Sequence, residues 1–394
     1  MTGWVRAVAH TGLIVLGLGA SFIVIEVGLR MSRGRSPLAE RSLPQLVEET
    51  AVLFEYDAML GWRGKPHARG TLGKIPIRLN SFGFREREIS ISKTKEVVRI
   101  LVLGDSQTWG LGVEEDQRFT NLLQKFLLAR GVSAEVLNFG VNGYGTDQEL
   151  LLFTRVRARF LPDLVIVAFY WNDLFENSLP EAYGYPKPHY VLRSDGGLAV
   201  HNVPVPKSPD QRITGGLAAD TGQKRQGTAW EVWGRLKGWM DVHLRVYGLV
   251  AGFVRQSTRF YPLAVQMGIA AGPRHDPDAA YWKITKGLLL LLRESVERVG
   301  GELLVAVIPE KSDFDAGTHN IRGVLIEDMR PLRVLDLYPS MATAGRDQSL
   351  YYRNDIHLNA KGHRVIAHRI FEYLIGSNLL AGKSSERENR SRAE

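Results

Sequence analysis

A serine at the end of an apolar run is the residue whose surroundings most favour nucleophilic chemistry in this chain. The apolar segment 97–103 stops at a Gly-Asp-Ser sequence that ends in Ser106, which is typical of a buried strand followed by a tight turn. In an α/β sheet, the carboxyl end of a strand faces the crevice where ligands bind. A serine alcohol needs a base to take its proton, and a carboxylate commonly orients that base. Asp355 and His357 supply both groups later in the chain.

Two further sequences at strand ends could stabilise an oxyanion. A stretch rich in Gly and Asn follows the strand expected over 134–137 and contains Gly143. Such loops can turn backbone N–H groups toward an anion. Asn172 follows the apolar strand expected over 164–169, and its side-chain amide can donate a hydrogen bond to an oxyanion. Each sequence alone is ordinary strand-to-helix turn chemistry, so their interest lies in their combination with Ser106.

Together these sequences resemble the GDSL, or SGNH, hydrolase family over residues 96–374. The resemblance implies that Ser106 is the nucleophile and His357 the base. It also implies an oxyanion hole formed by the N–H groups of Ser106 and Gly143 with the Asn172 side chain.

The chain departs from the family pattern at two positions. Asn354 stands three residues before the histidine, where the best-known members carry the acid, and Asp355 stands two residues before it. The Asp-x-His spacing resembles a branch that includes bacterial polysaccharide acetylation proteins, so we assign the acid to Asp355. Tyr170 replaces the glycine usually found two residues before the oxyanion asparagine.

These residues predict a serine-dependent ester hydrolase with a Ser-His-Asp triad, acting on acyl or acetyl esters of glycans or lipids. The same chemistry serves an O-acyltransferase that passes an acetyl group to a polysaccharide hydroxyl, and the sequence leaves that alternative open. The two departures also leave open a membrane-tethered glycan-binding or assembly protein without turnover. No cofactor and no metal are expected, and we interpret His363 and His368 as structural.

The elements expected around these residues alternate between strand and helix. The expected strands cover 97–103, 134–137, 164–169, 302–308 and 334–337, and the expected helices cover 118–130, 147–160, 279–299 and 360–375. This alternation predicts an α/β fold with a doubly wound parallel sheet sandwiched by helices. The catalytic domain is then formed by 96–177 and 279–381.

Two segments do not fit this alternation. The leader, 51–95, is expected to contain a short hairpin with strand residues Ile75, Ile77 and Leu79 and a turn at Asn80-Ser81. We expect its aromatic residues to pack on an edge of the sheet; they are Trp62, Phe82 and Phe84. Segment 178–278 is expected to be a cap over the Ser106 crevice, with Trp230 and Trp233 on a helix. The tail, 382–394, is expected to be disordered.

Composition limits the classes of function. The 394 residues include no cysteine, which excludes disulfides, catalytic thiols and thiolate metal sites. The net charge of +8 is spread along the chain and would suit an anionic membrane surface or an acidic glycan. No recognition motif accompanies the charge, so we expect no nucleic-acid partner.

The first residues predict a membrane anchor. Segment 7–25 is apolar for about 19 residues, which is roughly 28 Å of helix at about 1.5 Å per residue. We therefore predict an uncleaved transmembrane helix over 7–29 and a linker over 30–50. Several arginines follow the span and favour a cytoplasmic body by the positive-inside rule. The family resemblance favours an extracytoplasmic, periplasmic body, which we prefer without excluding the other orientation.

Overall fold

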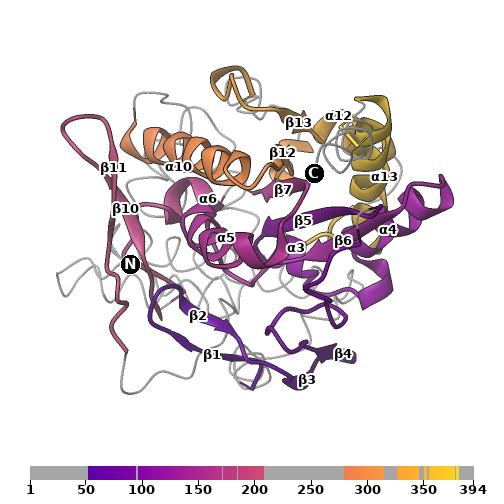
Figure 1. Cartoon of the computed structure of the whole chain (residues 1–394), viewed down its shortest axis with the longest axis horizontal. Helices are drawn as coiled ribbons and strands as arrows, with labels where there is room; N and C mark the ends of the chain where they lie inside the picture. The colour runs from indigo at the N-terminus through magenta and orange to yellow at the C-terminus, as the bar shows by residue number, and fades with distance from the viewer. Residues whose placement is uncertain are drawn as a thin grey trace, which may run out of the picture. The chain divides into compact units, whose positions relative to one another are not determined.

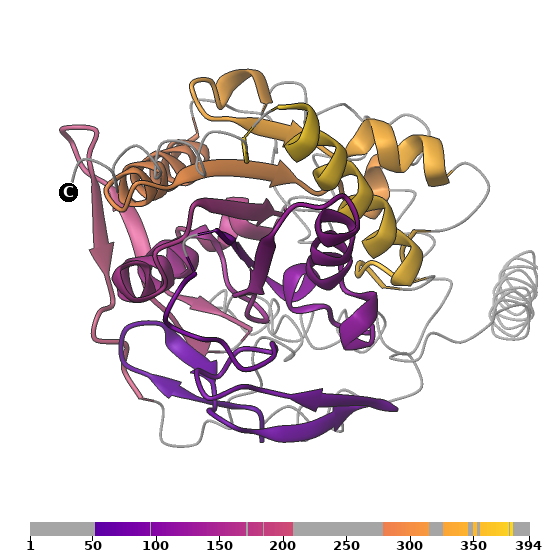
Figure 2. The same cartoon turned by 45° about the vertical axis from the view of Figure 1, so that its right-hand side comes forward.

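The computed structural model describes most of the predicted catalytic domain and leader (Figures 1 and 2). The described residues are 52–94, 96–170, 172–183, 185–207, 279–314, 326–345, 350–352, 355–377 and 379–380. The predicted anchor, linker and tail lie outside them, as does most of the predicted cap. Among the described residues, no helix is both long enough and apolar enough to cross a membrane. The anchor over 7–29 therefore stays a prediction.

The centre of the described part is a five-stranded parallel sheet. Its strands are β5 (Val98–Gly104), β6 (Ala134–Asn138), β7 (Leu164–Phe169), β12 (Glu302–Val307) and β13 (Val334–Asp336). They lie in the order β13-β12-β7-β5-β6, and every adjacent pair is parallel. The predicted parallel sheet is thus confirmed, with strand ends within one or two residues of those expected.

Four long helices cover the sheet: α4 (Phe119–Ala129), α5 (Thr146–Phe160), α10 (Ala280–Glu297) and α13 (Ala360–Gly376). Alternate residues of β5 enter two separate apolar clusters, Leu101 and Leu103 on one face and Ile100 and Val102 on the other. The first cluster contains residues of α5 and α10, and the second contains residues of α4 and α13. Because a strand turns successive side chains to opposite faces, both faces of this sheet need a helical layer. Figure 2 shows the two layers.

The strand order reverses at β5. From β5 the chain first runs through α4 to β6 on one side, and then through α5 to β7 on the other side of β5. In open α/β sheets, ligands bind outside the carboxyl ends of the strands at such a reversal. The residues that follow β5 therefore occupy the position at which this topology opens a crevice.

The leader forms two hairpins, which lie on the β6 side of the sheet in Figures 1 and 2. β1 (Phe54–Asp57) pairs with β2 (Gly61–Gly64), and β3 (Arg69–Leu72) pairs with β4 (Ile75–Arg78). The predicted turn at Asn80-Ser81 is present, since the Gly83 N–H donates to the Asn80 carbonyl at 3.0 Å, but this turn does not close the hairpin. The hairpin closes earlier, at Gly73-Lys74, because Gly73 adopts a φ of +68° that suits a two-residue link.

Asn80 instead organises the loop that leaves β4. Its Oδ1 accepts hydrogen bonds from the N–H groups of Phe82 and Phe84, each at 3.0 Å. The aromatic residues of the leader pack against residues that follow β6 and against the end of α5 rather than against a strand of the sheet. Phe84 lies 4.0 Å from the Phe139 ring between centroids, and the fully buried Trp62 donates from Nε1 to the Asn142 carbonyl at 3.0 Å.

The first part of segment 178–278 is described as far as residue 207. It forms two hairpins, made of β8 (Glu181–Ala182) with β9 (Tyr185–Pro186) and β10 (His189–Leu192) with β11 (Leu198–His201). β10 packs against α5 and α10, and Lys187 is fully buried. This part therefore belongs to the packed domain. The cap over the crevice stays a prediction, with Trp230 and Trp233 outside the described residues.

Candidate active site

Ser106 begins a short helix directly after β5. The strand ends at Gly104, where a Cβ would lie 2.1 Å from Thr108 Oγ1, so only glycine allows the turn to close this tightly. Asp105 then caps α3 (Ser106–Trp109), because its Oδ1 accepts a hydrogen bond from the Gln107 N–H at 2.8 Å. Burial raises the pKa of the Asp105 carboxyl to about 6. These contacts hold Ser106 at the strand end, as the sequence predicted.

His357 lies on a loop that leads into α13. Across this loop, Tyr351 and Leu358 form an antiparallel bridge, and the Tyr352 N–H donates to the His357 carbonyl at 3.0 Å. Asn359 caps α13 by accepting hydrogen bonds from the N–H groups of Lys361 and Gly362. The loop is therefore closed on itself before the helix begins.

The structure brings the three predicted catalytic residues into one hydrogen-bonded chain. His357 Nε2 lies 2.8 Å from Ser106 Oγ, and His357 Nδ1 lies 2.5 Å from Asp355 Oδ1. The same Oδ1 also accepts the backbone N–H of His357 at 3.0 Å. An ionised Asp355 can only accept, so it keeps the ring proton on Nδ1 and leaves Nε2 free to accept the serine proton.

The Asp355–His357 pair is partly exposed. The side chains of His357 and Asp355 keep 14% and 20% of their accessible surface. Burial raises the pKa of Asp355, but the hydrogen bonds and charge of His357 outweigh it and leave this pKa below its usual value. Asp355 therefore stays ionised at neutral pH. Asn354, at the usual family position of the acid, lies outside the described residues.

The predicted oxyanion donors follow β5, β6 and β7, which are neighbours in the sheet. Among the described residues, the N–H groups of Ser106 and Gly143 donate to no acceptor. Asn172 begins α6 (Asn172–Glu176), and its Nδ2 lies 3.5 Å from Glu176 Oε2. No hydrogen bond among the described residues joins Gly143 or Asn172 to the triad. Their oxyanion role therefore stays a prediction.

One side chain that contacts the loop of His357 could not be identified from the sequence. Lys311 follows β12, and its Nζ donates to the Tyr352 carbonyl at 2.6 Å and reaches the Asp355 carbonyl at 3.4 Å. A lysine after a strand is usually solvated, and nothing in its neighbours marks it. Its contacts depend on a loop about 40 residues away, which local patterns cannot register.

His363 and His368 both lie on α13 but differ in environment. His363 is buried and stacks on Phe119, whose N–H donates to His363 Nδ1 at 3.3 Å. Burial, aided by the nearby arginines, lowers the pKa of His363 to about 3. His368 is exposed and lies 3.4 Å from Glu372. Both contact residues of the helical layer, as expected for structural histidines.

A cluster of buried carboxyl groups lies on α5 and α6. Asp147, Glu149 and Asp173 are each 1% exposed or less. Asp147 pairs with the buried Lys187, whereas Asp173 Oδ2 accepts a hydrogen bond from the Thr146 hydroxyl at 3.0 Å. Burial and the neighbouring carboxylates raise the pKa values of Glu149 and Asp173 well above normal. Among the described residues, no group of His, Cys, Asp or Glu is arranged to hold a metal ion.

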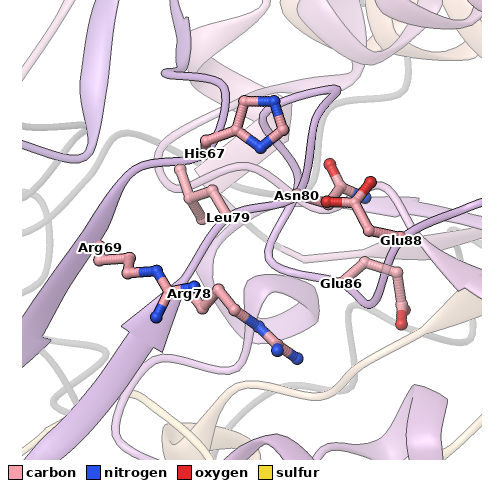
Figure 3. Close-up of a pocket in the computed structure, with 7 residues that line it drawn as sticks. All are labelled: His67, Arg69, Arg78, Leu79, Asn80, Glu86 and Glu88. Carbon is pink, nitrogen blue, oxygen red and sulfur yellow. The ribbon is translucent and has the colours of Figure 1, made fainter.

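A surface hollow of about 220 Å³ lies on the leader (Figure 3). Its lining residues all come from the leader: His67, Arg69, Arg78, Leu79, Asn80, Glu86 and Glu88. None of the predicted catalytic or oxyanion residues is among them. This hollow is therefore distinct from the Ser106 site.

With the geometry established, comparison with known proteins gives a family. Residues 102–205 match the GDSL-like Lipase/Acylhydrolase family. The chain therefore contains a GDSL-like lipase/acylhydrolase domain. This finding confirms the resemblance seen in the sequence and supports an ester-hydrolysing enzyme. The matched residues include Ser106, Gly143 and Asn172 and end before Asp355 and His357, whose relation to Ser106 rests on the distances above.

Several solved structures are distantly similar to this chain. TesA is 13% identical, with a TM-score of 0.38 over 72% of this chain and 99% of that one. The esterase EstA from Pseudoalteromonas sp. is 11% identical, with a TM-score of 0.37 over 71% of this chain and 97% of that one. A family 3 carbohydrate esterase from Clostridium thermocellum is 13% identical, with a TM-score of 0.37 over 72% and 98%. These values are too low to indicate a shared activity. No curated protein matches the chain.

Proposed function

We propose that this protein is a serine-dependent hydrolase of acyl or acetyl esters and that Ser106, His357 and Asp355 form its catalytic triad. The observation that carries the proposal is the pair of contacts at His357, with Nε2 at 2.8 Å from Ser106 Oγ and Nδ1 at 2.5 Å from Asp355 Oδ1. Ser106 and His357 are separated by 251 positions in the chain. Their convergence gives a nucleophile, a base and an orienting acid in the order that acyl transfer requires.

The reaction would proceed in two steps. Ser106 Oγ attacks the ester carbonyl as its proton passes to His357 Nε2, and the carbonyl oxygen becomes an oxyanion. The alcohol then leaves with the proton from His357, so that an acyl group remains on Ser106. In the second step water attacks this acyl group while its proton passes to His357, and the acid leaves as Ser106 recovers the proton. Asp355 stays ionised throughout and stabilises the imidazolium.

Stabilisation of the oxyanion is assigned to Ser106, Gly143 and Asn172. The proposal is supported by the N–H groups of Ser106 and Gly143, which donate to no acceptor in the part of the chain that the structure describes, and by the position of all three residues after neighbouring strands. Loss of one such donor commonly costs about 3 kcal/mol of transition-state stabilisation.

An ester-hydrolysis panel on the purified protein tests the proposal. p-Nitrophenyl acetate and a longer acyl ester are compared as substrates for the wild type and for Ser106→Ala. We expect the wild type to hydrolyse at least the acetyl ester and Ser106→Ala to lose several orders of magnitude in kcat, because triad residues act as one unit. A folded Ser106→Ala protein that retains more than about a tenth of the activity would remove Ser106 from the mechanism.

The site is further proposed to act at a membrane, on the extracytoplasmic side, on esters of glycans or lipids. The support is the apolar segment 7–25 together with the family match. Carbonate extraction of membranes from cells that express the full chain tests the anchor. Full-length, uncleaved protein in the soluble fraction would contradict it, and a C-terminal reporter active only in the cytoplasm would reverse the orientation.

A further inference from the structure

Gln107 joins α3, the helix that begins at Ser106, to the loop that carries His357. It follows Ser106 directly and is 1% exposed. Its Nε2 donates to the Ile356 carbonyl at 3.0 Å, and its Oε1 accepts from the Leu358 N–H at 3.1 Å. Both ends of one planar amide therefore bind the residues on either side of His357.

Two other contacts hold the loop that carries His357, and neither of them involves α3. The bridge between Tyr351 and Leu358 closes the loop on itself, and Lys311 holds it from the β12 side. Gln107 belongs to the same short helix as Ser106, and its own N–H is fixed by Asp105. A displacement of the loop relative to Ser106 must therefore stretch the Gln107 amide contacts.

We propose that Gln107 is a positioning residue that sets the distance and direction between His357 Nε2 and Ser106 Oγ. The inference rests on the proposed hydrolytic function and adds to it a residue whose side-chain amide contacts the backbone on either side of His357. Glutamine suits this role because its amide always presents one donor side and one acceptor side. Methionine has a similar length and presents neither.

The expected effect is on turnover more than on binding. A misplacement of about 1 Å in a catalytic group can lower the rate roughly a hundredfold. Gln107→Met should therefore reduce kcat by about that factor, while KM changes little because no substrate contact is removed. Gln124→Met is the matched control. Gln124 also bonds to a backbone group, the Val136 N–H at 2.8 Å, but it does so between α4 and β6.

A second variant makes the test depend on the charge of the side chain. In Gln107→Glu, a protonated carboxyl still offers one donor and one acceptor, whereas an ionised carboxylate places acceptors against the Ile356 carbonyl. The kcat of Gln107→Glu relative to the wild type should therefore rise as the pH is lowered. The same ratio for Gln107→Met should stay flat. A purely structural role would change the melting temperature without making the pH dependence of kcat differ between the two variants. If Gln107→Met fails to fold, the pH dependence of Gln107→Glu alone tests the proposal.

Proton NMR of the His357 ring supplies a readout that needs no substrate. The Nδ1 proton in the short contact with Asp355 should give a far-downfield signal in the wild type, in Ser106→Ala and in Gln124→Met. It should shift or broaden in Gln107→Met. Absence of ester hydrolysis by the wild type would contradict the proposed function itself. An active wild type beside a Gln107→Met protein with unchanged kcat and an unchanged Nδ1 signal would overturn the role of Gln107 alone.

Discussion

Two acid–base pairs in this molecule each join an aspartate to a basic side chain but have opposite surroundings. Asp355 and His357 form a pair on a loop, where each side chain keeps part of its exposed surface. Asp147 and Lys187 form a pair in which both side chains are fully buried. The loop pair ends at a serine hydroxyl, whereas the Lys187 ammonium of the buried pair also donates to the Glu176 carbonyl at 2.9 Å.

The difference shows how burial and the third partner decide what such a pair does. The imidazole between Asp355 and Ser106 has one nitrogen that can accept a proton, and water can reach it. Lys187 Nζ instead donates to the Asp147 carboxylate and to the Glu176 carbonyl. We therefore interpret the Asp355–His357 pair as the proton-transferring unit. The Asp147–Lys187 pair instead fixes the start of segment 178–278 to α5.

Removal of the orienting charge should give the largest effect on turnover. Asp355→Asn should lower kcat by about 10⁴-fold, since the amide favours the wrong imidazole tautomer and cannot stabilise the imidazolium. Asn354→Ala is the adjacent control and should change kcat far less. Steady-state kinetics on the two purified variants test the ranking. The reverse order would mean that another acid orients His357.

Breaking the buried pair should instead affect stability. Lys187→Met leaves the Asp147 carboxylate buried without its partner, and removal of one member of such a pair costs about 3–5 kcal/mol of unfolding free energy. Turnover per folded molecule should change little. Urea unfolding measures the loss, and Asp147→Asn combined with Lys187→Met should cost less than the sum of the single changes. An unchanged unfolding free energy in the single variant Lys187→Met would contradict the stabilising role of the Asp147–Lys187 pair.

Two histidines on α13 extend the comparison of buried with exposed groups to the pH dependence of stability. His363 has a pKa of about 3 in the folded protein, and its pKa in the unfolded chain is about 6.5. Below about pH 6.5 the unfolded chain gains a proton that the folded state does not, so stability falls by about 1.4 kcal/mol for each pH unit down toward pH 3. Unfolding curves over this window should be flatter for His363→Gln than for the wild type. His368→Gln, exposed on the same helix, should follow the wild type.

The buried carboxyl groups should give the smallest effect, with the opposite pH dependence. Burial raises the pKa of Glu149 in the folded protein, so the folded state holds a proton that the unfolded chain releases as the pH rises. Stability contributed by this group is present at low pH and is lost as the pH rises above the unfolded value of about 4.3. Glu149→Gln should therefore be more stable than the wild type at pH 8, by on the order of 1 kcal/mol, and similar at pH 4. Equal differences at both pH values would contradict the raised pKa.

The sheet and its helices could be predicted because their patterns are local. β7 is apolar throughout, and α4 places Phe119, Leu122, Leu123 and Leu127 on one buried face. The strand order and the place of the leader hairpin could not be predicted in this way. The hairpin depends on whether the chain reverses at Gly73 or at Asn80, and both positions carry residues that favour turns.

The residues in and around the candidate site also differ in whether the local sequence could predict them. Ser106, Asp355 and His357 could be proposed from the sequence because their residue types suit a nucleophile, an acid and a base, and the structure places them within hydrogen-bond distance. Gln107, Lys311 and Lys187 contribute through contacts with residues between 40 and about 250 positions away or on another element. Such partners become visible only when the fold brings them together, because each residue type is ordinary at its own position.

Covalent labelling of the nucleophile tests the central claim most directly. A fluorophosphonate probe reacts with a serine only when a neighbouring base activates it, so labelling reports the Ser106–His357–Asp355 contacts without knowledge of the natural ester. We expect mass spectrometry to locate the adduct on Ser106 in the wild type, with no adduct in Ser106→Ala and strongly slowed labelling in Asp355→Asn. An unlabelled wild type, or an adduct on a different serine, would contradict the proposed triad.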